Sequence, residues 1–286
     1  MKRLGINTVH LDMEEIIDLG LNRVEFVLGR GKSYEVMHSE VLKGIKEAEK
    51  LKFPYSIHLP LFAFDWYEED YLSAFYLDPD EEKRELSFKL LEENLIHLKE
   101  FHPDYYIIHF QGVYKFQQDE MKFKKKLDNT LTRLNELSIK YEIKLLLEYF
   151  GSNYMFYKID DWIKFIVPYS NLGILCDTGH LYFSSIMHEF DFFEGLEKLA
   201  QSSDAFHLWT TKGNKAYTDS EYYIEYHHIV AHMAQKKIDG FAFDVKKLMD
   251  IISRYDRPII IEASEKYRGR KYFLEGIRSI VEYFVK

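Results

Sequence analysis

The amino-acid sequence predicts an α/β protein with a (β/α)8 barrel, the TIM-barrel fold, in a single domain over residues 1–286. The length suits such a barrel, which takes about 250 residues. Eight β-type runs alternate with longer helical runs, and most are continuously apolar, as in parallel strands covered on both faces. The predicted strands are Leu4–Val9, Arg23–Leu28, Tyr55–Leu59, Tyr105–Gln111, Lys144–Tyr149, Leu172–Asp177, Ala205–Trp209 and Pro258–Ala263.

Helices are predicted between the strands from apolar residues at helical spacing and from capping residues. One helix opens at Asp78, an N-cap candidate, with Pro79 in the first turn and acidic residues near the positive helix end. An open doubly wound sheet is the alternative, but its Gly-rich phosphate turn is missing after the first strand. The other predicted helices follow Ser39 and cover Lys122–Tyr141, Asp160–Val167, Phe190–Ala200, Asp244–Arg254 and Phe273–Val285.

Composition limits the classes of function. Apolar residues make up 47% of the chain, enough for a large core, and the net charge of -9 argues against an extensive basic nucleic-acid surface. The single cysteine, Cys176, excludes a disulfide framework and favours a reducing compartment. Without a membrane-length apolar run or a signal peptide, we expect a cytoplasmic protein with no membrane partner. The stretch 210–239 is too long for an ordinary connection and is expected to be a functional loop or lid.

Chemistry-bearing side chains stand at the carboxyl ends of six successive predicted strands, where barrels place their reactive groups. Burying such groups together is unfavourable unless a cation gathers them. We therefore predict a divalent-metal site centred on Glu148, Asp177, His207 and Glu262. Mixed imidazole and carboxylate ligands suit zinc, with manganese or cobalt as alternatives. The six strand-end residues are His58, His109, Glu148, Asp177, His207 and Glu262, and Glu25 of the second strand is a possible addition.

The remaining reactive residues have weaker claims. Cys176 precedes Asp177, so strand alternation turns it away from the pocket and argues against a nucleophilic role. His10 ends the first strand, and a place inside or outside the pocket is equally open. Surface or packing roles are expected for His97, His102 and His188.

The segment Leu175-Cys176-Asp177-Thr178-Gly179-His180 resembles the Asp-Thr-x-His element of the xylose isomerase-like barrels. That superfamily includes endonuclease IV and many sugar isomerases and epimerases, and the resemblance covers essentially the whole chain. It implies that Glu148, Asp177, His207 and Glu262 form the four-ligand site that both branches share.

The extra histidines resemble endonuclease IV, which implies a cluster of two or three zinc ions. His58, His109 and Glu148 would share one ion, the four-ligand site would hold the second, and His180 would begin a third. Two departures stand against this branch: Leu208-Trp209-Thr210 replaces an Asn-Asp-Ser stretch, and Gly179 replaces a cysteine. The family's Asp-x-His element is also absent, so the candidates that complete the third site are His228 and His232.

Two enzymatic hypotheses remain, with the first slightly favoured by the extra histidines. The first is metal-activated hydrolysis of a phosphate ester, such as damaged DNA, in the manner of endonuclease IV. Arg30 or Lys32 would meet phosphates there, although ordinary solvated loop charge is the more common role of such residues.

The second hypothesis is isomerisation or epimerisation of a sugar or sugar phosphate. Glu148 and Glu262 would take and return a proton, and His180 would bind a hydroxyl. A barrel that binds a metal or ligand without catalysis is the third, least favoured hypothesis. The aromatic residues expected to line a sugar pocket are Phe62, Phe64, Trp66, Phe110, Tyr149, Phe150 and Trp209.

Overall fold

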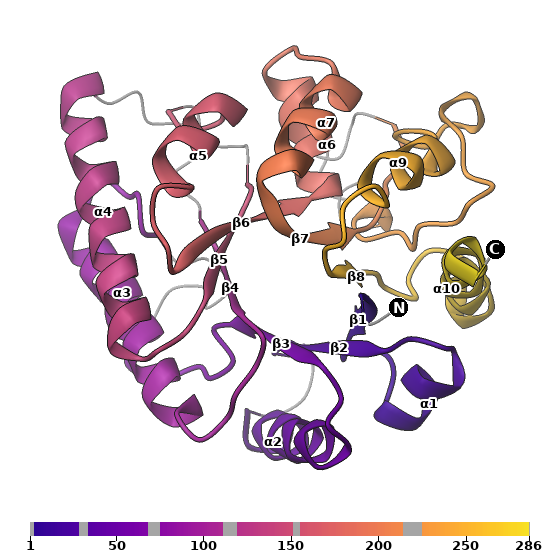
Figure 1. Cartoon of the computed structure of the whole chain (residues 1–286), viewed down its shortest axis with the longest axis horizontal. Helices are drawn as coiled ribbons and strands as arrows, with labels where there is room; N and C mark the ends of the chain where they lie inside the picture. The colour runs from indigo at the N-terminus through magenta and orange to yellow at the C-terminus, as the bar shows by residue number, and fades with distance from the viewer. Residues whose placement is uncertain are drawn as a thin grey trace. The chain divides into compact units, whose positions relative to one another are not determined.

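The computed structural model describes residues 3–28, 34–67, 75–110, 119–150, 155–213 and 225–285. Within these residues, eight parallel strands follow one another in sequence order around a closed barrel (Figure 1), which confirms the predicted fold class. Each strand end lies within two residues of its predicted position. The strands are β1 (Leu4–Asn7), β2 (Arg23–Phe26), β3 (Tyr55–Leu59), β4 (Tyr106–His109), β5 (Leu145–Glu148), β6 (Leu172–Asp177), β7 (Ser203–Leu208) and β8 (Ile259–Ile261).

All the predicted helices are present, with shifted ends. The first turn expected at Asp78 was wrong: Asp80 is the N-cap, and its side chain accepts the Glu82 amide at 2.9 Å. Asp78 instead accepts the Asp80 amide at 2.8 Å, so Pro79 lies before the helix. The predicted helices are α2 (Tyr34–Leu51), α3 (Glu81–Leu98), α4 (Glu120–Lys140), α5 (Ile159–Ile166), α7 (Phe192–Ser202), α9 (Val245–Ile252) and α10 (Gly269–Val285).

Of the α-helices whose bounds the structure describes, α1 and α6 were not predicted from the sequence. Helix α1 (Met13–Asp18) has only six residues and begins with a capping box. In that box the Asp12 carboxylate accepts the Glu15 amide at 2.9 Å, and the Glu15 side chain accepts the Asp12 amide at 3.3 Å. Helix α6 (Thr178–Met187) begins directly at the end of β6, without an intervening loop.

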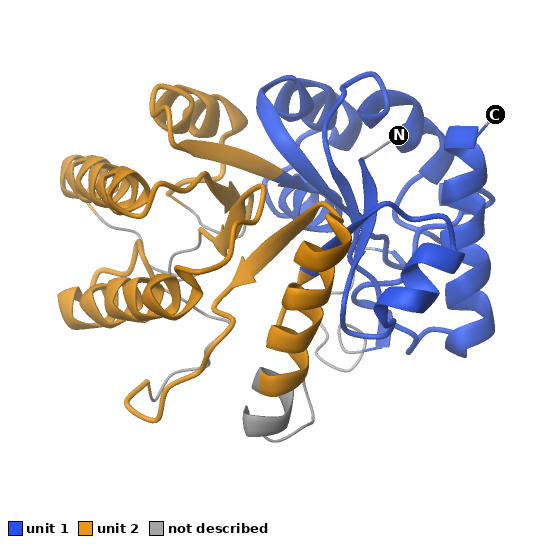
Figure 2. Ribbon diagram, turned by 60° about the horizontal axis from the view of Figure 1, so that its bottom comes forward, with its two compact units in different colours: residues 1–25, 176–286 blue, residues 26–175 orange. Residues whose placement is uncertain are grey.

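The chain divides into two compact units (Figure 2). Unit 1 comprises residues 1–25 and 176–286. Within it β1 pairs with β8 and β8 pairs with β7, while α7 packs against both α6 and α9. Fully buried side chains such as Ile260 and Phe206 form its core. The strand ends of this unit therefore stand above a closely packed apolar core.

Unit 2 comprises residues 26–175. Here β3, β4 and β5 pair in parallel, and the register sets Glu148 level with His109 on one side and with Leu175 on the other. Trp162 of α5 packs against Phe110 and Tyr149, with ring centroids 5.8 Å and 5.0 Å away. These two aromatic residues belong to the core between sheet and helix, so their predicted place in a pocket lining was wrong.

The described parts of the stretch 210–239 are tied to the strand ends of unit 1. Thr210 and Ile229 exchange backbone hydrogen bonds of 2.9 Å and 3.0 Å, and Lys212 pairs with Phe241. A short 3-10 helix, η1, covers Lys237–Asp239. Arg30 and Lys32, the predicted phosphate contacts, lie outside the described residues. Among the described helices, none is both long and apolar enough to cross a membrane.

Candidate metal centre

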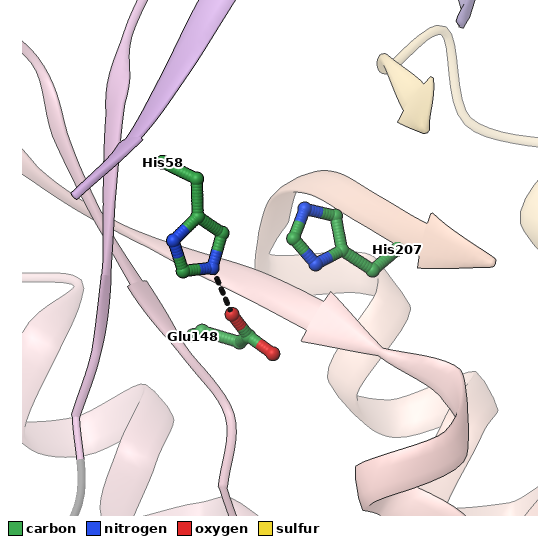
Figure 3. A group of neighbouring side chains, drawn as sticks. All are labelled: His58, Glu148 and His207. Atoms are coloured by element: carbon green, nitrogen blue, oxygen red, sulfur yellow. Dashed lines mark hydrogen bonds and ion pairs between the residues drawn. The ribbon is translucent and has the colours of Figure 1, made fainter. Parts of the chain in front are cut away.

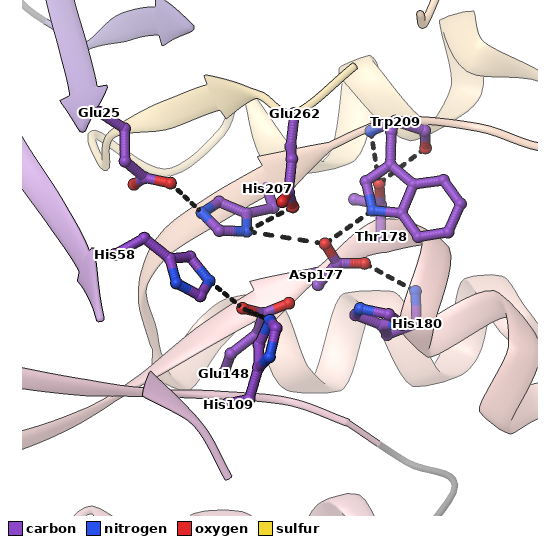
Figure 4. Close-up of polar contacts among 10 residues, drawn as sticks. All are labelled: Glu25, His58, His109, Glu148, Asp177, Thr178, His180, His207, Trp209 and Glu262. Carbon is purple, nitrogen blue, oxygen red and sulfur yellow. Dashed lines mark hydrogen bonds and ion pairs between the residues drawn. The ribbon is translucent and has the colours of Figure 1, made fainter. Parts of the chain in front are cut away.

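Unit 1 brings three of the predicted ligands together at the ends of three strands. Asp177 ends β6, His207 lies in β7, and Glu262 follows β8. His207 Nδ1 lies 2.9 Å from Glu262 Oε2 and 3.7 Å from Asp177 Oδ2 (Figure 4). Asp177 and His207 are fully buried, and the Glu262 side chain is 12% exposed. One ligand atom from each of the three lies within 4.8 Å of the other two, a spacing that could hold a divalent cation.

The other ring nitrogen of His207 faces the carboxylate of Glu25. The Nε2 atom lies 3.0 Å from Glu25 Oε1, and both side chains are buried. A carboxylate on the far nitrogen fixes the orientation and tautomer of an imidazole ligand. Glu25 was predicted only as a possible addition to the site, and in the structure its carboxylate lies beside His207 Nε2.

Both carboxylate oxygens of Asp177 accept hydrogen bonds. Oδ1 accepts the backbone amide of His180 at 2.6 Å, so Asp177 is the N-cap of α6. Oδ2 accepts the indole N–H of Trp209 at 2.7 Å. The Asp-Thr-x-His element thus has a local physical basis, because its aspartate ends a strand and caps the helix that follows at once. The contact with Trp209 was not foreseen from the sequence.

Unit 2 brings the other three predicted strand-end residues together. Glu148 ends β5 and is fully buried. Its Oε2 atom lies 3.0 Å from His58 Nε2 (Figure 3) and 3.3 Å from His109 Nε2. The two imidazole rings meet edge to face at 4.7 Å. A single carboxylate oxygen is therefore shared by two imidazoles, an arrangement that serves either to orient Glu148 or to supply ligands.

The third-site candidates also belong to unit 1. The His180 side chain is buried. Its ring centroid lies 5.5 Å from that of Trp209 and 6.2 Å from that of His227. His228 stacks on His227 at 3.7 Å, with its backbone in the left-handed region. His232 Nδ1 accepts the Ala234 amide at 3.1 Å.

In the described ranges, no group of three or more metal-type ligand atoms within 4.8 Å includes His109, His180, His228 or His232. Ligation by these four remains a prediction. His227 was not predicted as a site residue, although two adjacent histidines in a Tyr- and His-rich stretch are a usable signal.

Among the described residues, no potential metal-binding group includes the histidines or the cysteine with weaker claims to a reactive role. His97 and His102 are exposed, and His188 lies at the C-terminal end of α6. Burial is the main cause that raises the pKa of the Cys176 thiol well above its usual value, which agrees with a non-nucleophilic role. His10 packs edge to face on Phe273, and partial burial lowers the pKa of its imidazole.

A comparison with known protein families matches residues 13–283 to the xylose isomerase-like TIM barrels. The protein belongs to this family. The match covers most of the chain and confirms the resemblance drawn from the Asp177-Thr178-Gly179-His180 segment. No curated protein matches the chain by sequence.

Several solved structures share the fold. The apo 3-keto-D-glucoside 4-epimerase from E. coli matches with a TM-score of 0.64 at 12% identity, covering 100% of both chains. A D-psicose 3-epimerase crystallised with D-fructose matches with a TM-score of 0.63 at 13% identity, over 98% of this chain and 97% of that one. The IolI protein with a bound zinc atom matches with a TM-score of 0.63 at 14% identity, over 99% of this chain and 96% of that one. At these identities, the matches establish the fold.

Proposed function

We propose that this protein is a divalent-metal-dependent isomerase or epimerase of a small sugar. The observation that carries the proposal is the buried group of Asp177, His207 and Glu262, a donor set that fits a divalent cation. The names of the structural neighbours support a sugar substrate, since two are sugar epimerases, and one neighbour holds zinc. They support this hypothesis better than hydrolysis of a phosphate ester.

Glu148 is the proposed fourth ligand. It is level with Leu175 in the β5–β6 pair, and Asp177 lies two residues further along the same strand. Side chains two apart on a strand share a face, as do register partners, so Glu148 and Asp177 point to the same side of the sheet. In a closed barrel, the carboxyl ends of the strands gather at one mouth.

When bound, the cation would polarise the substrate carbonyl as a Lewis acid. Glu148 and Glu262 would then act as the base and the acid of the proton transfer. One carboxylate removes the proton from the carbon next to the carbonyl, and the other returns a proton to the opposite face or to the neighbouring carbon. The first outcome inverts a centre. The second moves the carbonyl, and in that case the proton of the neighbouring hydroxyl also passes to the former carbonyl oxygen. His180, held at the first turn of α6, would donate a hydrogen bond to a substrate hydroxyl.

Hydrolysis of a phosphate ester is the second candidate, and one observation favours it. His58 and His109 both contact Glu148 Oε2, which gives this cluster two more imidazoles than a one-metal site needs. A second ion beside Glu148 would use them as ligands. In the sugar isomerase they would instead orient the carboxylate for proton transfer. The two functions therefore differ in the number of ions per chain.

Hydrogen exchange with solvent tests the proposal. The metal-loaded protein is incubated in D2O with a panel of ketopentoses, ketohexoses and their phosphates, and deuterium next to the carbonyl is followed by NMR. We expect incorporation by the wild type and a loss of about 100-fold or more in Glu262→Gln and Glu148→Gln. Glu265→Gln is the control, because Glu265 pairs with Arg270. Cleavage of a phosphodiester without any exchange would contradict the proposal.

A further inference from the structure

We propose that Trp209 is a positioning residue whose indole N–H fixes the Asp177 carboxylate for cation binding, and that Gly179 is the residue that makes room for it. The inference rests on the proposed function, in which Asp177 is a metal ligand. Trp209 follows β7 directly, two residues after His207. Its Nε1 donates to Asp177 Oδ2 at 2.7 Å, and the indole is fully buried (Figure 4).

The backbone of Trp209 is hydrogen-bonded to Thr178, the residue that follows Asp177. Thr178 Oγ1 donates to the Trp209 carbonyl at 3.0 Å and accepts the Trp209 amide at 3.2 Å. The next residue, Thr210, is paired with Ile229 through two backbone hydrogen bonds. The position of the indole therefore follows from backbone contacts on both sides and does not depend on the bound cation.

Gly179 is what allows the indole to lie there. A Cβ atom at this position would fall 2.2 Å from both Cε2 and Cζ2 of Trp209, far inside any van der Waals contact. The φ angle of Gly179 is not in the left-handed region, so the requirement for glycine here is one of space rather than backbone conformation. Any larger residue at 179 would displace the ring from Asp177.

This contact joins two of the sequence departures from endonuclease IV. One departure is Trp209 within the stretch after His207, and the other is glycine in place of cysteine within the Asp-Thr-x-His element. In space they are two halves of a single packing contact. The chain thus carries a way of orienting its metal-type aspartate that a cysteine at 179 would not permit.

The chemistry of the contact explains why it would matter to the cation. Oδ1 of Asp177 caps α6 through the His180 amide at 2.6 Å, and Oδ2 receives the indole at 2.7 Å. With one donor on each oxygen, the carboxylate plane is fixed, and Oδ2 stays within 3.7 Å of His207 Nδ1. Charge-assisted hydrogen bonds of this kind are strong, and loss of such a partner typically weakens metal binding by about 10–100-fold.

Trp209→Phe tests the role by removing the N–H while keeping an aromatic ring. Zn²⁺ and Co²⁺ dissociation constants are measured by competition with a chromophoric chelator, and circular dichroism confirms that each variant is folded. We expect binding weaker by about 10–100-fold. The matched control is Trp162→Phe, which also removes a buried indole donor, here bonded to the Phe156 carbonyl at 2.9 Å. Its dissociation constants should stay within about threefold of the wild type.

Gly179→Ala provides an independent second variant. It should weaken metal binding in the wild-type background, and its effect should not add to that of Trp209→Phe, because both substitutions break one contact. Unchanged affinity in folded Trp209→Phe would overturn the inference. An equal loss in Trp162→Phe would also overturn it, by showing a general effect of destabilisation.

A measurement without metal separates this inference from the proposed function. In the apoprotein, the ¹⁵N-labelled indole Nε1–H signal of Trp209 should shift on Asp177→Asn, while the Trp162 signal stays in place. An unmoved Trp209 signal would refute the contact itself. Wild-type protein that binds neither ion would refute the proposed function and the cation-binding role of Trp209 with it, even if the indole signal shifts as expected.

Discussion

Replacing Glu262 by glutamine should remove most of the stabilisation of the fold by divalent cations. Glutamine keeps the shape of the side chain beside His207 but removes the negative charge that lies 2.9 Å from Nδ1. The change also removes one of the carboxylates crowded around this imidazole, with Glu25 and Asp177. We therefore expect the apo form of the variant to be at least as stable as the apo wild type.

The size of the effect follows from mass action. A cation at a concentration about 100 times its dissociation constant stabilises the native state by about 2.7 kcal/mol. For a protein of this size, about 1 kcal/mol moves the melting temperature by roughly 2–4 °C, so the wild type should gain about 5–10 °C. If the variant binds about 100-fold more weakly, the same concentration contributes only about 0.4 kcal/mol, or about 1 °C.

The assay is a thermal melt of chelator-treated protein with and without Zn²⁺, Mn²⁺ or Co²⁺. Glu265→Gln is the matched control, because Glu265 lies three residues further along the chain and pairs with Arg270. It should retain the full shift. A wild-type-sized shift in Glu262→Gln would refute the reasoning, since the cation would then bind without this carboxylate.

Three further predictions concern other parts of the molecule. Elemental analysis should find one transition-metal ion per chain, whereas two or more would favour the hydrolase, with His58 and His109 as ligands. NMR should give His10 a pKa below its ordinary value near 6.5, because burial disfavours the charged ring. Its neutral form therefore stabilises the fold above about pH 6.5, and that stability is lost as the pH falls. A His10 titration midpoint at or above about pH 6.5 would contradict this prediction. Cys176 should resist thiol reagents until the protein unfolds, and rapid labelling of native protein would show that burial does not protect it.

The strands could be predicted from the sequence because a parallel strand buried on both faces leaves a short apolar run. The clearest case is Leu172–Asp177, whose predicted and observed bounds agree. Helix α6 was missed for the converse reason: its first eight residues are all buried, so it has no polar face to mark a helical period. Helix α1 is too short for the period to show.

Within each unit, the grouping of the candidate residues could be predicted from their place at strand ends, because the carboxyl ends of parallel strands lie at the same edge. Asp177, His207 and Glu262 meet in unit 1, and His58, His109 and Glu148 meet in unit 2. The pairing of side chains could not be predicted. Which carboxylate holds His207 Nε2, and which donor holds Asp177 Oδ2, depends on rotamers and on the path of the chain after β7. Phe110 is different: it was predicted to line the pocket, although strand alternation from His109 would have placed it on the opposite face of the sheet.

A crystal structure of metal-soaked protein, with anomalous scattering recorded at the metal edge, is the most direct measurement. We expect one anomalous peak at about 2.0–2.3 Å from Asp177, His207, Glu262 and Glu148. The proposed metal centre would be contradicted if no anomalous peak lies among these four side chains. It would also be contradicted if the only peak is held by His58, His109 and Glu148.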